Sequence, residues 1–273
     1  MTPSKPARRA ASSAPHGTQA IQRAISVLKF FADPDTETEI TTSTLARELS
    51  LTQGTVSRIV KALVAEGLVA RNPITEGHHL GSTAVLIGQA AQRAFGLDKA
   101  LPVLEDVSAQ TRESVNLSVR EGDESVVMLR VQSTLPLRFE QHTGARFPLY
   151  TTASGKAILA FSDDAAHYVK SLPLVLTKVT PHTLDSPDKL AQQLASTLQR
   201  GYSIDAEENV EGVRCVGAPI LDSNGHAHAA VVIQVPTVRM PRERERELGA
   251  LVIQAGREIG RLVPVNRAMS QLH

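Results

Sequence analysis

Residues 43–66 read STLARELSLTQGTVSRIVKALVAE and decide the fold of the first part of the chain. The apolar spacing predicts a short helix over residues 43–49 and a longer helix over residues 53–66. Thr52 is a favoured N-cap residue for the longer helix, and Gly67 supplies its C-terminal stop. Steps of three and four residues put one apolar stripe of this helix inside, formed by Val56, Ile59, Val60, Leu63 and Val64. The stretch therefore predicts a helix-turn-helix.

The opposite face of the longer helix is polar. A recognition helix needs short polar donors and cations on its outer face, with its first turn in the major groove of DNA. Arginine can contact guanine through two hydrogen bonds, glutamine can contact adenine in the same way, and serine or threonine can bond to phosphate or base. The candidate DNA-binding residues are Thr52, Gln53, Gly54, Thr55, Ser57, Arg58 and Lys61. The alternative is an ordinary amphipathic helix pair with a solvated polar face.

A two-stranded wing favours DNA binding over that alternative. Residues 68–71 and 78–80 are short extended segments on either side of a loop that contains Asn72-Pro73 and Gly77. The wing adds Arg71 to the candidate DNA-binding residues. A further amphipathic helix is predicted upstream, with its apolar face formed by Ile21, Ala24, Ile25, Leu28 and Phe31.

Net charge does not mark this part of the chain as a DNA-binding domain. Residues 18–82 hold six basic and seven acidic side chains, whereas a DNA-binding domain is usually basic. Four of the acidic residues fall in a predicted loop over residues 33–39, and residues 52–64 carry only two charged side chains, Arg58 and Lys61. Residues 1–17 are rich in Ala, Ser and Pro and predict a flexible tail, which adds Lys5, Arg8 and Arg9.

Composition restricts the class of protein. A chain of 273 residues with 42% hydrophobic residues is expected to form two domains with buried cores. No apolar run is long enough to span a membrane, and the first residues lack the apolar centre of a signal peptide. The single cysteine, Cys215, excludes an internal disulfide framework. We therefore expect a cytoplasmic protein with no membrane partner. The six Phe, three Tyr and no Trp argue against stacking on single-stranded nucleic acid.

The remaining pattern predicts a second, α+β domain. Helices are expected over residues 98–111, 154–161, 164–172, 187–200 and 242–263, and strands over residues 114–120, 125–131, 202–205, 215–221 and 228–235. Residues 132–152 are expected to be a long irregular segment. Such a mixture favours an antiparallel sheet with helices packed around it. The predicted parts are a tail (1–17), a winged helix-turn-helix domain (18–82), a polar-faced linker helix (83–96), an α+β domain (97–265) and a C-terminal tail (266–273).

No signature of an enzyme occurs. The phosphate-cradling loop, the nucleophile elbow and the zinc-binding His-Glu-x-x-His motif are all missing. Ser154 and Lys156 resemble a catalytic serine–lysine pair, but that chemistry needs a different spacing. As the start of a helix, the same residues offer free backbone N–H groups that suit an anion or a carbonyl. We therefore predict no catalytic residue, no cofactor and no metal, and a hydrolase that uses Ser154 and Lys156 remains as an alternative.

Other reactive side chains have structural interpretations. The histidine pairs lack neighbouring cysteines or a carboxylate pattern, so surface positions are favoured over metal ligands. A lone cysteine in an apolar strand is more often a small buried hydrophobe than a reactive thiol. The favoured interpretations are surface histidines at 78, 79, 226 and 228, a buried hydrophobe at Cys215, a solvated turn at residues 205–208 and an exposed, ion-paired helix face at residues 242–247.

The chain resembles the IclR family of bacterial transcription regulators over residues 18–262. The first block that carries the resemblance, residues 57–69, is common to many winged-helix proteins. The second block runs from Gly144 to Ala160 and includes Ser154-Gly155-Lys156-Ala157. The third runs from Gly201-Tyr202-Ser203-Ile204-Asp205 through Glu208, Gly212, Cys215 and Pro219. The second and third blocks together are specific to the family.

The resemblance implies a winged helix, a linker helix and an effector-binding domain related to the GAF and PAS folds. Family members typically dimerise through the DNA-binding part and associate further as dimers of dimers. The effector pocket implied by the resemblance is lined by Phe139, Phe147, Ala153, Ser154, Asp205, Cys215, Val232 and Gln234. Members that sense very small keto acids tend to carry serines where Val232 and Gln234 align here. A larger effector than glyoxylate is therefore expected.

Together these observations predict a sequence-specific transcription regulator, most often a repressor in this family. Its operator in double-stranded DNA should be an inverted repeat, because a twofold dimer presents two identical recognition helices. Its DNA binding should respond to a small organic acid or an aromatic metabolite. A constitutive DNA binder with a degenerate, empty sensor domain is the second alternative, beside the hydrolase.

Overall fold

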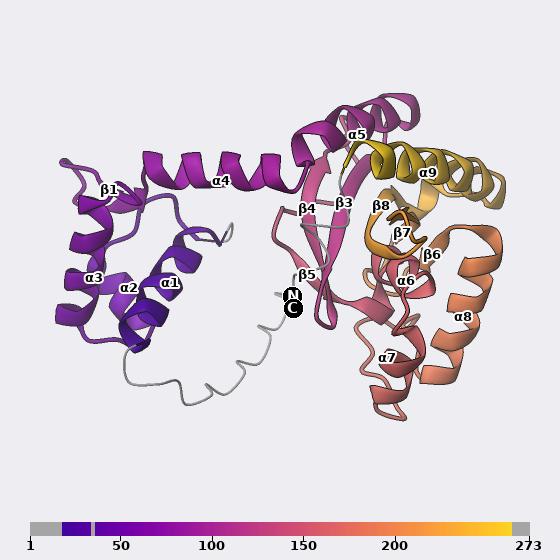
Figure 1. The fold of residues 1–273 in the computed structure, drawn as a ribbon, viewed down its shortest axis with the longest axis horizontal. Helices are drawn as coiled ribbons and strands as arrows, with labels where there is room; N and C mark the ends of the chain where they lie inside the picture. The colour runs from indigo at the N-terminus through magenta and orange to yellow at the C-terminus, as the bar shows by residue number, and fades with distance from the viewer. Residues whose placement is uncertain (1–17, 34–35, 264–273) are drawn as a thin grey trace. The chain divides into compact units, whose positions relative to one another are not determined.

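The computed structural model describes residues 18–33 and 36–263 (Figure 1). The predicted tails, residues 1–17 and 266–273, lie outside the described residues. The chain forms two compact units, and the division between them falls inside one helix, between Gln89 and Ala90.

The first unit contains the predicted helix-turn-helix. Its helices are α1 (Gln19–Phe31), α2 (Thr42–Glu48) and α3 (Gln53–Ala65). The left-handed backbone of Gly67, with φ +69°, ends α3 as expected. The core of this unit comprises Val27, Ile40, Leu45, Val56, Val60, Leu63 and Val69.

Two apolar stripes differ from the prediction. Val64 was expected inside, but its side chain is 37% exposed because α3 rests on Val56, Val60 and Leu63 instead. In α1 the buried position is Val27, while Ile21 and Ile25 are 61% and 45% exposed. Part of the predicted apolar face of α1 therefore points away from the core of its own unit.

The wing forms as predicted and is held by an acidic side chain. Strands β1 (Val69–Arg71) and β2 (His78–Leu80) pair antiparallel. Glu39 accepts hydrogen bonds from Asn72 Nδ2 at 2.7 Å and from Thr75 Oγ1 at 2.6 Å, which ties the wing loop to the segment before α2. The prediction of a surface histidine at position 78 was wrong. Its backbone pairs with Ile40, which draws the side chain inside to 7% exposure.

Helix α4 (Ser82–Ala94) follows the wing. None of its residues is buried against other described residues. The polar-faced helix predicted here also exposes a run of large apolar side chains, because Val85, Leu86 and Ile87 are each more than half exposed.

The second unit is built on a six-stranded antiparallel sheet. The strands, in the spatial order β5-β4-β3-β8-β7-β6, have the bounds Arg146–Pro148, Glu124–Val131, Ser114–Glu121, Ala227–Pro236, Val213–Leu221 and Ser203–Ala206. Edge strand β5 was missed because it has only three residues. It lies within the segment 132–152 that was expected to be irregular, which also holds the short 3-10 helix η1 (Leu149–Thr151).

The two faces of the sheet differ in their cover. Helices α5 (Leu97–Thr111) and α9 (Arg242–Leu262) pack side by side on one face and form the largest apolar core with it (Figure 1). The buried positions of α5 include Ala100 and Val103, whereas Ala109 is exposed. Helix α6 (Ala153–Ala160) covers the opposite face, and α7 (Ala165–Ser171) and α8 (Pro187–Arg200) follow it.

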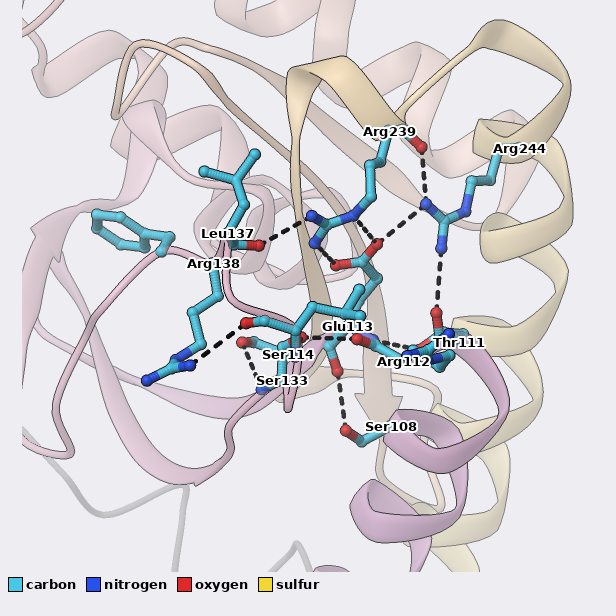
Figure 2. A network of polar contacts seen from close by, with 12 residues as sticks. Ser108, Thr111, Arg112, Glu113, Ser114, Ser133, Leu137, Arg138, Arg239 and Arg244 are labelled. Carbon is cyan, nitrogen blue, oxygen red and sulfur yellow. Dashed lines mark hydrogen bonds and ion pairs between the residues drawn. The ribbon is translucent and has the colours of Figure 1, made fainter.

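The buried Glu113 carboxylate, directly after α5, forms ion pairs with Arg239, just before α9, and with Arg244 of α9. Figure 2 shows the Glu113 carboxylate, 1% exposed, between the guanidinium groups of Arg239 and Arg244. Arg239 binds it through two parallel hydrogen bonds, of 2.8 Å from Nε and 2.5 Å from Nη2, and Arg244 Nη1 lies 3.0 Å from Oε1. Residues 242–247 are therefore not simply an exposed face, because Arg244 is half-buried against this network.

Candidate functional site

The outer face of α3 presents its predicted polar residues to solvent. Gln53, Gly54, Ser57, Arg58 and Lys61 are all exposed. A Cβ atom built on Gly54 would meet nothing within 4 Å, so the backbone there can be approached closely from outside. This face combines two cations, an amide, a hydroxyl and accessible backbone.

Thr52 and Thr55 have a local role at the start of α3. Thr52 Oγ1 accepts a hydrogen bond from Thr55 N at 3.3 Å, and the two hydroxyls lie 2.8 Å apart. The Thr52 side chain therefore caps the helix and orients its first turn, as the N-cap rule predicts.

Arg71, the predicted wing contact, is already paired. Its Nη2 lies 2.5 Å from Glu76 Oε1 across the wing, and both side chains are more than half exposed. An exposed ion pair of this kind contributes little to stability, so the guanidinium can exchange its partner for a phosphate at small cost.

A shallow apolar groove runs between α1 and α3. It has a volume of about 490 Å³ and is lined by Ala20, Ile21, Arg23, Ala24, Thr55, Arg58, Ile59, Ala62 and Leu63. The exposed Ile21 on its α1 side gives the unit an uncovered apolar face next to the recognition helix.

The second candidate site is a small pocket between the sheet and α6. Seven of the eight residues predicted to line an effector pocket lie around it, namely Phe147, Ala153, Ser154, Asp205, Cys215, Val232 and Gln234. The eighth, Phe139, packs beside it against the apolar cluster of Ala153, Val213, Cys215 and Val232. The sequence reasoning missed the other lining residues, Asn116, Ser118, Val127, Gln141, Thr152 and Asn209.

Strand register brings the floor of this cavity together. Cys215 lies opposite Asp205 on one side and Gln234 on the other, and Val232 lies opposite Asn116. Because side chains alternate between faces, these residues leave the sheet on the side of α6, while Val216 and Ile233 enter the apolar core on the other side. The free volume is only about 20 Å³, which is room for about one water molecule.

One end of the cavity is acidic. Lys156 Nζ lies 2.5 Å from Glu208 Oε2, and both side chains are buried. Asp205 Oδ1 accepts a hydrogen bond from Glu208 N at 2.7 Å. Lys156 therefore pairs with Glu208, and the second carboxylate, that of Asp205, lies nearby without an ion pair of its own. Burial raises the pKa of Asp205 to about 7, with Glu208 acting in the same direction and Lys156 against it. The solvated turn predicted here was wrong, because β6 carries Asp205 into the interior.

The Cys215 thiol lies next to this acidic end. Burial raises its pKa well above the ordinary value, and the Asp205 carboxylate acts in the same direction. The thiol is therefore protonated at neutral pH, in agreement with a small buried hydrophobe.

The residues at the start of α6 are engaged with one another. Lys156 is paired with Glu208, and Ser154 Oγ hydrogen bonds with Ser125 Oγ at 2.7 Å and Thr152 Oγ1 at 3.2 Å. Thr152 Oγ1 also accepts from Gly155 N at 3.0 Å. The expectation of free N–H groups was therefore wrong for Gly155, because the Thr152 side chain caps the helix.

The other end of the cavity is rich in donors. Gln141 Oε1 accepts hydrogen bonds from Asn116 Nδ2 at 2.7 Å, Gln234 Nε2 at 2.8 Å and Arg130 Nη1 at 3.2 Å. The two ends of the cavity therefore differ in charge, with carboxylates at β6 and a guanidinium at β4.

A larger hollow of about 640 Å³ lies elsewhere in the second unit. Ends of α8, β7 and α9 line it, with Arg200, Arg257 and Arg261 among its residues. None of the predicted site residues borders it. Among the described residues, no group of three or more His, Cys, Asp or Glu side chains is arranged to hold a metal ion. In the same part of the chain, no helix combines the length and apolarity needed to cross a membrane.

Comparison with known proteins gives the family. A family model described as the bacterial transcriptional regulator IclR C-terminal domain matches residues 90–261, and the IclR helix-turn-helix domain matches residues 20–73. The chain belongs to the IclR family. It is therefore a DNA-binding transcriptional regulator, and its fold is the α+β arrangement of an N-terminal helix-turn-helix domain and a C-terminal domain with an antiparallel sheet.

Individual IclR-family proteins match along most of their length. The acetate operon repressor of Salmonella typhimurium is 32% identical over 266 residues, which cover 94% of this chain and 95% of that protein. The crystal structure of Thermotoga maritima IclR aligns with a TM-score of 0.76 and 28% identity, over 90% of this chain and 99% of that chain. An IclR homolog from Microbacterium hydrocarbonoxydans, solved in complex with 4-hydroxybenzoate, shares the fold with a TM-score of 0.76 and 24% identity, over 89% and 98% of the two chains.

The raised pKa of Asp205, at the acidic end of the cavity, predicts how the stability of the protein depends on pH. A carboxyl group with a folded pKa of about 7 and an ordinary value of 3.8 takes up a proton on folding between these two values. Its favourable contribution to stability is complete below about pH 4 and is lost as the pH rises through about 7. The free energy of unfolding of the wild type should therefore fall, relative to Asp205→Asn, by on the order of 4 kcal/mol from pH 4 to pH 8.

Urea denaturation at several pH values measures this difference. The matched control is Asp106→Asn, which removes an exposed carboxylate of α5 and should run parallel to the wild type. A constant difference between wild type and Asp205→Asn across the pH range would contradict a raised pKa at position 205.

Proposed function

We propose that this IclR-family regulator binds its operator through the outer face of α3, and that a small organic acid held between the sheet and α6 changes the operator affinity. One observation carries the ligand half of this proposal. Residues from β3, β4, β6, β7, β8 and α6 converge on one small cavity with an acidic end and a cationic end. A mostly enclosed cavity with a few convergent polar groups suits a small molecule.

Contacts to DNA would come from two places in the first unit. Gln53, Ser57, Arg58 and Lys61 would face the major groove, where the arginine can contact guanine and the lysine a phosphate. Thr52 and Thr55 would hold the first turn of α3 in position rather than contact bases directly. Arg71 would contact the DNA backbone from the wing after it leaves Glu76.

The oligomer would form from apolar surfaces that the described chain leaves uncovered. Ile21 and Ile25 of α1 and the Val85-Leu86-Ile87 run of α4 are exposed. Burial of such a surface against a second copy would remove the apolar groups from water. A twofold dimer would then read an inverted repeat, and the C-terminal domains would join dimers into tetramers. As a regulator of bacterial DNA, the protein would act in the cytoplasm.

The cavity chemistry favours a sensor over the two alternatives. A degenerate sensor would fill its pocket with apolar side chains, whereas here Asn116, Asp205 and Gln234 keep polar groups on the cavity wall. A hydrolase would need a base beside Ser154, but the candidate base Lys156 is held by Glu208. We therefore propose a binding function without catalysis.

The sign of regulation follows from which state the acid prefers. A ligand changes DNA affinity only if its affinity differs between the DNA-binding arrangement and another arrangement of the dimer. We propose that the protein represses transcription when it is bound to its operator, and that the acid lowers its operator affinity and so relieves the repression, as in a repressor of catabolic genes.

The DNA-binding assignment predicts a specific loss in one variant. Arg58→Ala should weaken binding to the operator by about 1–3 kcal/mol, the usual contribution of a direct base contact. Gel-shift titration on operator and random DNA measures it, with Arg246→Ala, an exposed arginine of α9, as the matched control.

The outcomes are distinct. An equal loss on operator and random DNA would make Arg58 a phosphate contact, and no loss on either would remove it from the interface. Footprinting of the wild type on its own upstream DNA should protect an inverted repeat.

The ligand assignment predicts a selective response to acids. In thermal-shift and calorimetric titrations, 4-hydroxybenzoate should bind more tightly than glyoxylate or pyruvate, because Val232 and Gln234 stand where family members that sense very small keto acids tend to carry serines. Cys215→Trp fills the cavity and should abolish the response. Tight glyoxylate binding would refute the expected size of the effector, and an unchanged response in Cys215→Trp would place the ligand elsewhere.

A further inference from the structure

The side-chain oxygen of Gln141 lies in an unusual set of donors. It accepts three hydrogen bonds, from Asn116 Nδ2 at 2.7 Å, Gln234 Nε2 at 2.8 Å and Arg130 Nη1 at 3.2 Å. An amide oxygen has two lone pairs and no net charge, whereas three convergent donors, one of them cationic, match a carboxylate oxygen better. Asn116, Gln234 and Arg130 are therefore arranged to donate to a stronger acceptor than the Gln141 amide oxygen.

The charge of Arg130 lacks a close anionic partner. Its guanidinium group, half-buried, donates to neutral oxygens only: those of Gln141, Asn116 and Gln234, Ser114 Oγ and the backbone carbonyl of Phe139. No ion pair joins it to any described residue, and its buried Nε has no hydrogen-bond partner among them. Glu140, the nearest acidic neighbour along the chain, pairs with Arg138 instead, at 2.9 Å. Burial of an unpaired cation is unfavourable, so an incoming anion would be strongly attracted.

Gln141 also limits the space in the cavity. It lines the cavity from the segment between β4 and β5, and the remaining volume of about 20 Å³ is too small for an organic acid. A ligand can enter only if a lining side chain leaves. Gln141 is the lining side chain that both reaches the cationic end and comes from outside the regular strands and helices.

We propose that the Gln141 amide is an internal stand-in for the effector carboxylate, which displaces it from Arg130, Asn116 and Gln234. This inference rests on the proposed function of the cavity and specifies its ligand and its switch. The ligand is a monocarboxylate whose other end carries a hydroxyl, because Asp205 and Glu208 accept hydrogen bonds and would repel a second carboxylate. Asp205 and Gln234 lie two strands apart, about 10 Å across the sheet, which suits an aromatic-sized spacer.

Displacement of Gln141 would be felt outside the cavity. The segment that carries it is fixed near its start, where Ser133 Oγ donates to Arg112 O at 2.7 Å and Arg239 Nη1 donates to Leu137 O at 2.9 Å (Figure 2). Arg239 in turn binds Glu113, directly after α5. Ligand entry would therefore disturb the contacts that Arg239 makes with Leu137 and Glu113 at the C-terminal end of α5. Helix α5 follows α4 in the chain.

Chemical rescue of Gln141→Ala tests the proposal with simple probes. The substitution removes the terminal amide but leaves the three donors, so acetate should bind there and acetamide should bind at least about tenfold more weakly. Melting temperature and calorimetry with each probe measure the preference. The matched control is Gln132→Ala, an exposed glutamine in the same segment that donates to Glu140, and neither it nor the wild type should prefer acetate.

Two further variants complete the test. Adding Arg130→Met to Gln141→Ala should abolish the preference for acetate, which separates Arg130 from an anion site at the start of α6. Gln141→Glu supplies a permanent internal carboxylate, and should raise the melting temperature and weaken 4-hydroxybenzoate binding by about tenfold. This variant decides the question if Gln141→Ala does not fold.

The inference and the proposed function fail in different ways. Equal binding of acetate and acetamide to Gln141→Ala, or wild-type binding of 4-hydroxybenzoate to Gln141→Glu, would overturn the inference even if acids bind the wild-type cavity. A wild type that binds no acid would overturn the proposed function, while the acetate preference of Gln141→Ala would still be decided by its own measurement.

Discussion

The buried ion pair of Lys156 and Glu208 is the interaction on which the C-terminal domain depends. It connects α6, which covers one face of the sheet, to the turn after β6, and both side chains are buried. Two charges can be removed from water only when the geometry of the pair and its further hydrogen bonds compensate for lost hydration. The same turn places Asp205 beside the pair, so a second carboxylate remains in the interior and its pKa rises. A polar cavity in this domain is a consequence of that arrangement.

The cavity connects two charged regions through the sheet. At one end the excess carboxylate is stable in its protonated form near neutral pH, and at the other a guanidinium is surrounded by neutral oxygens. A hydroxylated monocarboxylate would satisfy both ends at once. The segment between β4 and β5 contributes Gln141 to the cavity, and its Leu137 carbonyl accepts a hydrogen bond from Arg239 of the Glu113–Arg239–Arg244 network (Figure 2). This segment therefore connects the cavity to the contact between the end of α5 and α9.

The sequence predicted best what depends on local periodicity. The helix-turn-helix, the wing, the β3–β4 hairpin and α8 follow from apolar spacing, caps and turn residues, and Thr52 caps α3 as its residue type suggests. Family resemblance supplied seven cavity residues. Arg130, Asn116 and Gln141 were missed because their contacts depend on strand pairing and on the path of an irregular segment. His78 and Glu113 became buried for the same reason: a backbone bridge to Ile40 and two distant arginines determine their surroundings.

In the proposed mechanism, cavity occupancy and DNA binding are coupled, and linkage makes this coupling measurable from the ligand side. If an acid changes operator affinity by some factor, operator DNA must change the affinity for the acid by the same factor. The most direct test is calorimetric titration of the acid into the protein with and without a saturating operator duplex. We expect dissociation constants that differ by at least about fivefold, the lower range of allosteric coupling. Identical dissociation constants would contradict it.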